Sequence, residues 1–354
     1  MIDDKYDLGE WPKGELEHIG HCPLCGAKER KLLHQGLTDI LFYCAPGKWT
    51  LHQCQNCDAA YIDPRPSITS MHLAYRTYYT HNPVRDISIA NLPLVQRITR
   101  YLGNGYRNWK YGTSFQPSTI LGVVAAYLAP DLKKSIDVSY RYLPRAGGGK
   151  RVLDVGFGGG IFLEKALALG WDVAGADPDP LSVKNANSRG LNARQGGIEA
   201  FSDQLESFDL ITISHVIEHV HDPVATLRLA YKLLKPGGRL WLDTPNIDSF
   251  GYALYREHWL GVDSPRHLVI FGWDSMRLAL KKSGFNSPKY INRSSAALGI
   301  FPLSKQVRHH ALTSSDPFSA PPPKANWDAR MAAIKSKFIK KRAEFITVIA
   351  TKSL

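Results

Sequence analysis

Four of the five cysteines form two Cys-x-x-Cys pairs near the start of the chain. The first pair is Cys22 and Cys25, and the second is Cys54 and Cys57. Each pair can direct two thiolates at one ion, and two such pairs complete a tetrahedral Zn²⁺ site. In a reducing compartment this spacing indicates a metal site rather than disulfide bonds. No thioredoxin-like pattern surrounds the pairs to support redox chemistry. We therefore expect a structural zinc ion with no open position for catalysis.

A glycine-rich turn follows an apolar run in the second half of the chain. The run Arg151–Val155 is strand-like, the turn is Gly156–Gly160, and helical spacing begins at Ile161. Glycine lacks a Cβ and tolerates positive φ, so a ligand can approach such a turn closely. Open α/β sheets bind ligands at the carboxyl ends of their strands. A dinucleotide fingerprint would need glycine in place of Ile161, and a merely tight structural turn is the other alternative.

Acidic and histidine side chains follow other apolar runs of the same segment. Asp177 ends the next run, and His215 and His219 follow the run Phe208–Ile213. His267 lies in a loop further on. Histidine titrates nearest neutral pH, so each of these histidines is a candidate general base.

Short apolar runs alternate with helical patterns from about residue 148, which is typical of a parallel α/β sheet. We expect seven strands, at 151–155, 172–176, 192–195, 208–213, 239–243, 289–293 and 345–351. Helices are expected at 161–169, 179–190, 222–234 and 274–283. The stretch 298–323 is rich in proline, serine and histidine, which predicts a loop or lid.

Composition divides the chain into three regions. Residues 1–64 hold all the cysteines and predict a zinc ribbon, in which Cys44 is a spare or buried thiol. Residues 65–147 are rich in aromatic and basic side chains and predict a helical linker or substrate cap. Residues 148–354 hold the α/β pattern.

The motifs from Arg151 to Asn246 resemble a known enzyme family. The Gly-x-Gly-x-Gly turn, with Asp154 two residues before its first glycine, is similar to motif I of the class I S-adenosylmethionine (SAM) methyltransferases. The segments Ser214–Val220 and Thr244–Asn246 resemble methyltransferases of ubiquinone biosynthesis. The resemblance implies a seven-stranded Rossmann-like sheet over residues 148–354, with SAM as the cofactor.

The resemblance also implies which residues bind SAM. The family places an acid at the end of the second strand, on the ribose hydroxyls, and Asp177 holds this position. The other implied contacts are Asp154, Gly156, Gly158, Gly160, Pro178, Ile198, Ser214 and His215. Many relatives carry an acid after the third strand to bind the adenine amino group, whereas this chain has Gly196–Glu199. We therefore expect backbone and apolar contacts to adenine, with Ile198 against the ring.

Methyl transfer requires alignment of the acceptor and, for most acceptors, removal of a proton. Sugar C-methyltransferases with an N-terminal zinc region resemble this chain in layout and place histidines near His219 and His267. The resemblance therefore implies that these two are catalytic, with His215 as a third candidate. The alternative for His219 is that it only holds its loop. Arg256 and Arg266 could instead grip an anionic group of the substrate.

The order of zinc knuckles, Pro64-Arg65-Pro66, a tyrosine-rich helix and a SAM domain resembles a bacterial methyltransferase group. Its members are linked with sugar, glycan or secondary-metabolite modification. Tyr75, Tyr78 and Tyr79 could wall an acceptor pocket, although such residues more often belong to the core.

The net charge of +12 over 354 residues favours anionic partners: nucleic acid, a membrane surface or phosphorylated small molecules. No run of about 18 apolar residues could span a membrane, and Met1–Glu10 lacks the apolar core of a secretory signal. We therefore expect a soluble cytoplasmic protein.

Two basic regions could contact a partner. Arginines and aromatic residues interleave over 97–110, a pattern compatible with stacking on bases or sugars and equally with an ordinary helix. Trp327, Met331, Ile334 and Phe338 are spaced as one helix face beside several lysines. This helix could lie on a membrane, but packing of its apolar face on the sheet is the favoured interpretation.

Three functions follow from these patterns. The first is a SAM-dependent methyltransferase that acts on a small molecule, such as a sugar, a nucleotide-linked sugar or a related metabolite. The second is an RNA methyltransferase, which the zinc ribbon and the positive charge favour. Against it, the Asn/Asp-Pro-Pro-Tyr/Phe motif of base-amine methylators is missing where Ser214 and His215 stand. The third is a non-catalytic binding protein that retains the SAM fold.

Overall fold

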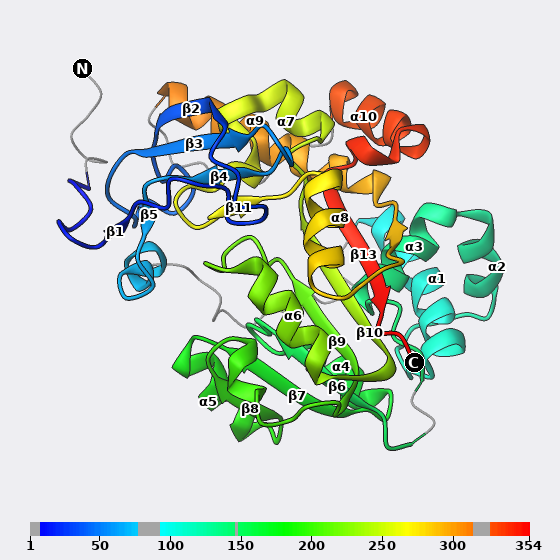
Figure 1. Ribbon diagram of the computed structural model, residues 1–354. Coiled ribbons are helices and arrows are strands. Elements are labelled where there is room, and N and C mark those ends of the chain that lie inside the picture. The colour runs from blue at the N-terminus through cyan, green and yellow to red at the C-terminus, as the bar shows by residue number, and fades with distance from the viewer. Residues whose placement is uncertain (1–7, 77–92, 146–147, 314–325) are drawn as a thin grey trace. The chain divides into compact units, whose positions relative to one another are not determined.

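The computed structural model describes residues 8–76, 93–145, 148–313 and 326–354. The chain forms two compact units by its internal contacts (Figure 1). The first contains Met1–Tyr78, Ile213–Lys232 and Leu240–Leu354, and the second contains Tyr79–Thr212 and Leu233–Arg239.

The strands expected beyond residue 148 form one seven-stranded sheet with the order β12-β13-β10-β9-β6-β7-β8. Its strands are β6 (Arg151–Val155), β7 (Asp172–Asp177), β8 (Asn192–Gln195), β9 (Phe208–Ser214), β10 (Leu234–Pro245), β12 (Lys289–Ile291) and β13 (Phe345–Thr351). β6, β7 and β8 pair in parallel, whereas β12 and β13 are antiparallel. The expected α/β fold class with seven strands is confirmed.

The helices that follow the parallel strands begin where the sequence predicts. α4 (Ile161–Ala168) follows the glycine turn, and α5 (Pro180–Ser188) follows β7. Asp179 caps α5 because its carboxylate accepts hydrogen bonds from the backbone amides of Leu181 and Ser182. Pro180 is the first helical residue, where its missing N–H has no cost.

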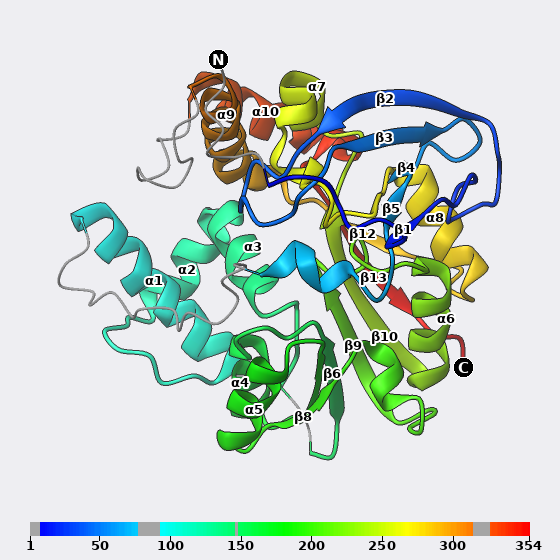
Figure 2. The same cartoon turned by 90° about the vertical axis from the view of Figure 1, so that its left-hand side faces the viewer.

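Three helices precede the sheet in the second unit, α1 (Leu94–Tyr111), α2 (Leu121–Leu128) and α3 (Pro130–Ser139) (Figure 2). α1 and α2 cross closely at a glycine, since a Cβ on Gly105 would lie 1.7 Å from the carbonyl oxygen of Thr119. Tyr106 is fully buried, and its hydroxyl donates to Asp137 at 3.1 Å. Tyr106 is therefore a core residue, as in the ordinary helix that the sequence left open beside base stacking.

The first unit contains a sheet built from two distant parts of the chain. The strands β2 (Arg30–Leu37), β3 (Trp49–Cys54), β4 (Ala60–Ile62) and β11 (Val269–Ile270) pair antiparallel in the order β11-β4-β3-β2. β1 (Leu16–Glu17) pairs with β5 (Arg65–Pro66). The N-terminal sheet thus receives β11 from the segment that also carries His267.

Figure 1 also labels the remaining helices of the described chain. They are α6 (Pro223–Leu233), α7 (Phe250–Tyr255), α8 (Trp273–Lys282), α9 (Ala297–Thr313) and α10 (Trp327–Phe338). Single helical turns are η2 (Met71–Tyr75), η4 (Ile198–Phe201), η5 (Arg256–His258), η6 (Leu260–Val262), η7 (Ser294–Ala296) and η8 (Lys340–Arg342). Within the described ranges, no helix is both long and apolar enough to cross a membrane.

The loop or lid expected over 298–323 is helical in its described part. Residues up to Thr313 belong to α9, and 314–323 lie outside the described residues. Buried side chains recur there at helical spacing: Ala297, Phe301, Ser304, Val307 and His310. This buried stripe outweighs the local effect of Pro302, which lies inside the helix.

One buried ion pair joins the separate segments of the first unit. The Arg266 side chain is fully buried, and its guanidinium donates to both carboxylate oxygens of Asp39, at 2.6 and 2.9 Å. It also donates to Asp263 and to the carbonyl oxygen of Ala74 at 3.0 Å. Burial acts to raise the pKa of Asp39, but the hydrogen bonds and charge of Arg266, together with hydrogen bonds from backbone amides, outweigh it and lower the pKa. The sequence left open that Arg266 binds an anionic group of the substrate. Because its guanidinium is buried and paired, it is not available for that role.

Replacement of Arg266 should be costly because it leaves two carboxylates buried without their cation. We expect Arg266→Leu to lower the free energy of unfolding by about 3–5 kcal/mol in urea titrations. Arg277→Leu is the matched control, since Arg277 forms an exposed pair with Asp274 and should cost below about 1 kcal/mol. Equal losses in the two variants would contradict the role given to the buried pair.

Candidate functional site

The glycine turn after β6 has the conformation that only glycine adopts readily. Gly156, Gly158 and Gly160 have φ of 69°, 54° and 80°. A Cβ added at Gly158 or Gly159 would meet no heavy atom within 4 Å. The turn therefore presents bare backbone to open space, which is what close approach of a ligand requires.

Two carboxylates flank this turn. Asp154, at the end of β6, is fully buried, and its Oδ1 accepts from Arg141 and from Thr212. Its Oδ2 is buried without a hydrogen-bond partner among the described residues. Asp177, at the end of β7, accepts from the backbone amides of Gly158 at 2.8 Å and Asp179 at 3.0 Å. Burial raises the pKa of Asp177.

This arrangement fits the nucleoside half of SAM. The open turn leaves room beside the backbone, and the carboxylate of Asp177 lies at the turn with lone pairs suited to vicinal hydroxyls. Pro178 directly follows Asp177, and Ile198 is buried in η4. Contacts of Asp154, Asp177, Pro178 and Ile198 to the cofactor stay predictions. Ser214, at the end of β9, belongs with His215 to the first unit.

In the first unit, His219 and His267 lie together. Their ring centroids are 4.7 Å apart at an interplanar angle of 70°. Nδ1 of His219 lies 3.0 Å from the carbonyl oxygen of Arg266, and Nδ1 of His267 lies 2.8 Å from that of Gly261. Because a carbonyl only accepts, each Nδ1 carries a proton, and in the neutral ring the lone pair is on Nε2.

Other side chains set the charge of His219. Burial, together with His267, lowers the pKa of His219 to about 4, so the ring is neutral at neutral pH. Burial acts to raise the pKa of Glu218, but hydrogen bonding to His215 and the histidine charges lower it to about 2. Glu218 is therefore an anion, and its Oε2 accepts from Thr244 at 2.9 Å.

A neutral histidine beside a buried carboxylate can do one of two things. It can accept a proton at its free Nε2. Alternatively, Glu218, His219 and His267 can hold a metal ion, since their ligand atoms lie within 4.8 Å of one another.

His215 does not join this pair. Its ring nitrogens lie 3.5 Å from Glu218 and 3.3 Å from Asp243, and its ring contacts Phe345 edge-on. Burial acts to lower the pKa of His215, but Asp243 and Glu218 outweigh it and raise the pKa to about 9. A histidine that is already protonated at neutral pH is not a general base, so the geometry does not favour this predicted role.

Tyr75 contacts the histidine pair directly. Its hydroxyl lies 3.0 Å from Nδ1 of His219. The other two tyrosines that were expected to wall a pocket, Tyr78 and Tyr79, lie outside the described residues. The sequence pointed to Tyr75 only through the tyrosine-rich segment, and nothing in it indicated contact with His219.

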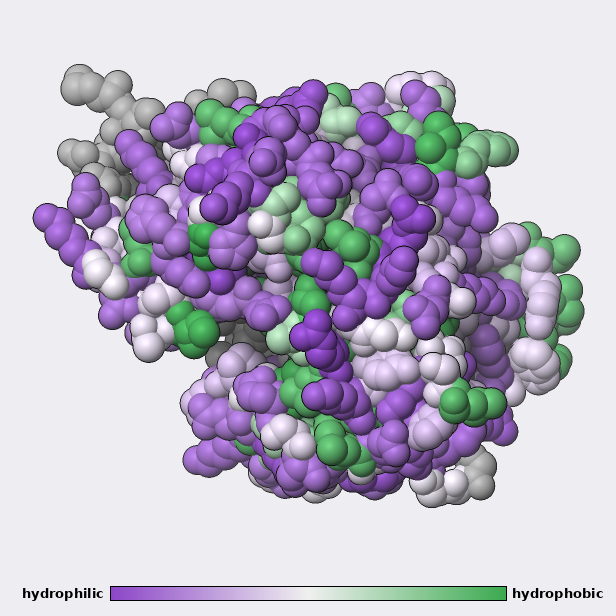
Figure 3. Space-filling view, in the orientation of Figure 1, coloured by the Kyte–Doolittle hydropathy of each residue, from purple (hydrophilic) through white to green (hydrophobic). Residues whose placement is uncertain are grey.

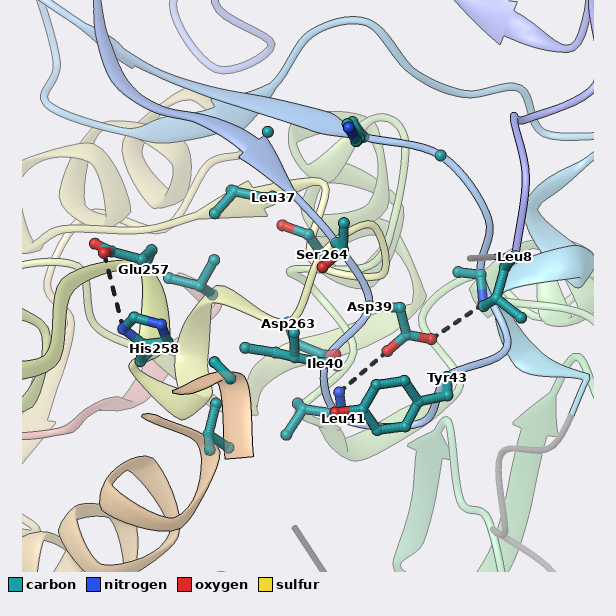
Figure 4. Close-up of a pocket in the computed structure, with 18 of the residues that line it drawn as sticks. Leu8, Leu37, Asp39, Ile40, Leu41, Tyr43, Glu257, His258, Asp263 and Ser264 are labelled. Carbon is teal, nitrogen blue, oxygen red and sulfur yellow. Dashed lines mark hydrogen bonds and ion pairs between the residues drawn. The ribbon is translucent and has the colours of Figure 1, made fainter. Parts of the chain in front are cut away.

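A cavity of about 490 Å³ lies in the first unit (Figure 4). Three carboxylates and one lysine line it: Asp39, Glu257, Asp263 and Lys48. Ser264 also lines it, is 4% exposed and has an Oγ without a partner among the described residues. Neither His219 nor His267 lines this cavity, but Asp263, which does, lies 3.9 Å from Nε2 of His267.

The four paired cysteines converge as the sequence predicts. Sγ of Cys22 is 3.6 Å from that of Cys57, and Sγ of Cys25 is 3.4 Å from that of Cys54. A tetrahedron with Zn–S bonds of about 2.3 Å separates its sulfur atoms by about 3.8 Å, so this set fits Zn²⁺. Cys44 lies outside the set, and its thiol donates to the carbonyl oxygen of Ala74.

Metal analysis tests this zinc assignment. We expect one zinc ion per chain in the purified protein and in Cys44→Ser, whose thiol is not a ligand. Cys54→Ser should lose the ion because three thiolates hold zinc far less tightly. Measurement is by plasma mass spectrometry, and a folded, zinc-free wild-type protein would contradict the assignment.

Comparisons with known proteins agree with these motifs. Residues 127–287 match a family model described as a methyltransferase domain. A segment of 113 residues is 41% identical to the ubiquinone biosynthesis O-methyltransferases of Xanthomonas oryzae pv. oryzae and Xanthomonas axonopodis pv. citri. In each case it covers 30% of this chain and 47% of the relative, so the match spans about half the length of these curated relatives.

The fold is also similar to solved structures. A SAM-dependent methyltransferase from Archaeoglobus fulgidus aligns with a TM-score of 0.41 and 20% identity, over 63% of this chain and 94% of that one. One from Mesorhizobium loti aligns with a TM-score of 0.42 and 18% identity, over 62% and 97%. By its motifs and by these matches, the segment 127–287 of this chain is similar to a methyltransferase domain.

Proposed function

We propose that the protein transfers a methyl group from SAM to a small-molecule acceptor, a sugar, a nucleotide-linked sugar or a related metabolite. The observation that carries this proposal is the open glycine turn flanked by Asp154 and Asp177. When bound, SAM supplies a methyl group already activated on its sulfonium sulfur. The protein's own tasks are to orient the acceptor, to exclude water and to remove a proton.

The base in this proposal is the pair of His219 and His267. His219 follows β9 closely in the chain, and ligands of open α/β sheets bind at the carboxyl ends of the strands. Nε2 of His219 takes the proton from the substrate group that becomes methylated, while its Nδ1–H stays hydrogen-bonded to the carbonyl oxygen of Arg266. The resulting imidazolium is stabilised by the anionic Glu218.

The cavity beside Asp263 supports a hydroxyl-rich acceptor. Its lining carries three carboxylates and one lysine, and Arg266 pairs with two of these carboxylates, those of Asp39 and Asp263. Carboxylates and the free hydroxyl of Ser264 suit sugar hydroxyls better than they suit phosphate groups. In a nucleotide-linked sugar, the sugar is therefore the part that would enter this cavity. The RNA alternative is weaker than the sequence suggested, because Tyr106 of the basic region is buried and cannot stack on a base.

We also propose that the four paired cysteines hold zinc in a structural role. All four positions of a tetrahedral ion are taken by thiolates, so no position remains for a substrate. The bound ion would fix the Cys22 and Cys54 turns at one end of the β2–β3 sheet.

The cofactor assignment predicts a loss of SAM binding when Asp177 is changed. We expect Asp177→Ala to weaken SAM binding at least tenfold in calorimetry, because two hydroxyls lose their acceptor. Asp172→Ala is the matched control, since Asp172 begins the same strand and pairs with Arg151 at the surface. Unchanged SAM affinity in Asp177→Ala would contradict the proposed contact between Asp177 and the ribose hydroxyls.

Methyl transfer itself is tested with isotope-labelled SAM against a panel of sugars and nucleotide sugars, with total RNA as the competing acceptor. Once an acceptor is found, His219→Ala and His267→Ala should each lower kcat by roughly 10²–10⁴ with SAM affinity retained. His72→Ala is the control, because His72 is exposed and bonds only to its own turn. Variants that turn over at the wild-type rate would refute the base assignment, and labelling of RNA alone would refute the acceptor class.

A further inference from the structure

Helix α10 buries its small residues and exposes its large apolar ones. Its inner face consists of Ala329, Ala332, Ala333 and Ser336. Trp327, Ile334 and Phe338 lie on the opposite side and are 73, 49 and 82% exposed, and Ile339 after the helix is 52% exposed. The expectation that this apolar face packs on the sheet is therefore wrong, and Figure 3 shows hydrophobic residues at the surface where Figure 1 labels α10.

The orientation of α10 is fixed by its inner contacts. The helix packs on α9 and η7, and the amide of Asn292 donates to the carbonyl oxygen of Ser336 at 2.8 Å. Asn326 caps its first turn by accepting from the amide of Ala329. A rotation of α10 that buried Trp327 and Phe338 would place bulky rings where alanines now pack. The packing of the helix therefore requires that these two side chains stay exposed.

The same segment concentrates positive charge. Residues 326–342 contain one acid, Asp328, and six basic residues: Arg330, Lys335, Lys337, Lys340, Lys341 and Arg342. This is a net charge of +5 on 17 residues, out of +12 for the whole chain. Exposed large apolar side chains beside several lysines, on one helix surface, are a combination that can bind lipid headgroup regions.

We propose that α10 and η8 bind the surface of a bilayer that contains anionic phospholipids. Trp327, Phe338 and Ile339 would enter the boundary between headgroups and acyl chains, and the lysines would contact lipid phosphates. A second copy of the chain is a poorer occupant, because a twofold contact would set the exposed lysines of one copy against those of the other. This inference is independent of the methyl acceptor.

Vesicle co-sedimentation of the full chain tests it. The probe is vesicles of phosphatidylcholine with 30% phosphatidylglycerol, compared with pure phosphatidylcholine, at low and at physiological salt. We expect at least tenfold stronger partitioning to the anionic vesicles, weakened by salt because the attraction is partly electrostatic. Absence of partitioning to anionic vesicles at low salt would overturn the proposal.

Variants test whether α10 is the part of the chain that binds the vesicles. Ile334→Ser/Phe338→Ser and Lys340→Glu/Lys341→Glu should each reduce partitioning at least tenfold, with unchanged SAM affinity and melting temperature. Val124→Ser/Leu128→Ser is the matched control, since these residues of α2 are 57 and 81% exposed. The proposal fails if the α10 variants partition like the wild type or if the α2 control loses binding equally. It also fails if sedimentation equilibrium shows a wild-type dimer that the α10 variants lose.

Discussion

The buried guanidinium of Arg266 is the interaction on which the first unit depends. Its side chain joins the 39–45 loop, η2 and the 263–266 loop, which are far apart in sequence. The backbone carbonyl oxygen of Arg266 accepts a hydrogen bond from Nδ1–H of His219. The next residue in the chain is His267. A single desolvated cation with two carboxylates therefore fixes the backbone that orients both histidines. Removal of either partner would leave charge buried without compensation.

The seven strands and the glycine turn could be predicted because they follow from local pattern. Short apolar runs between helical patterns specify a buried parallel sheet, and Asp179-Pro180 specifies the start of α5. The cysteine spacing likewise predicts convergence of four thiolates, since each pair forms its own turn. These features depend on residues that are neighbours in sequence.

The features that the sequence did not reveal depend on distant contacts. The pairing of β11 with β4 joins Val269 to Tyr61. Arg266 was a candidate to bind an anionic group of the substrate, whereas it is fully buried. Helical spacing correctly grouped Trp327, Ile334 and Phe338 on one face of α10. Spacing alone does not say which face is buried, and here the alanines pack inward. Composition alone also does not show which side chains are buried, and for this reason α9 was expected to be a loop.

The central claim is that the turn after β6 and the carboxylate of Asp177 bind the nucleoside half of SAM. The most direct measurement is a crystal structure of the protein with S-adenosylhomocysteine, the product of methyl transfer. The account predicts the ribose hydroxyls within hydrogen-bonding distance of Asp177 and the amino-acid end beside Gly156–Gly160. A nucleoside bound elsewhere, or density for a nicotinamide compound in its place, would contradict it.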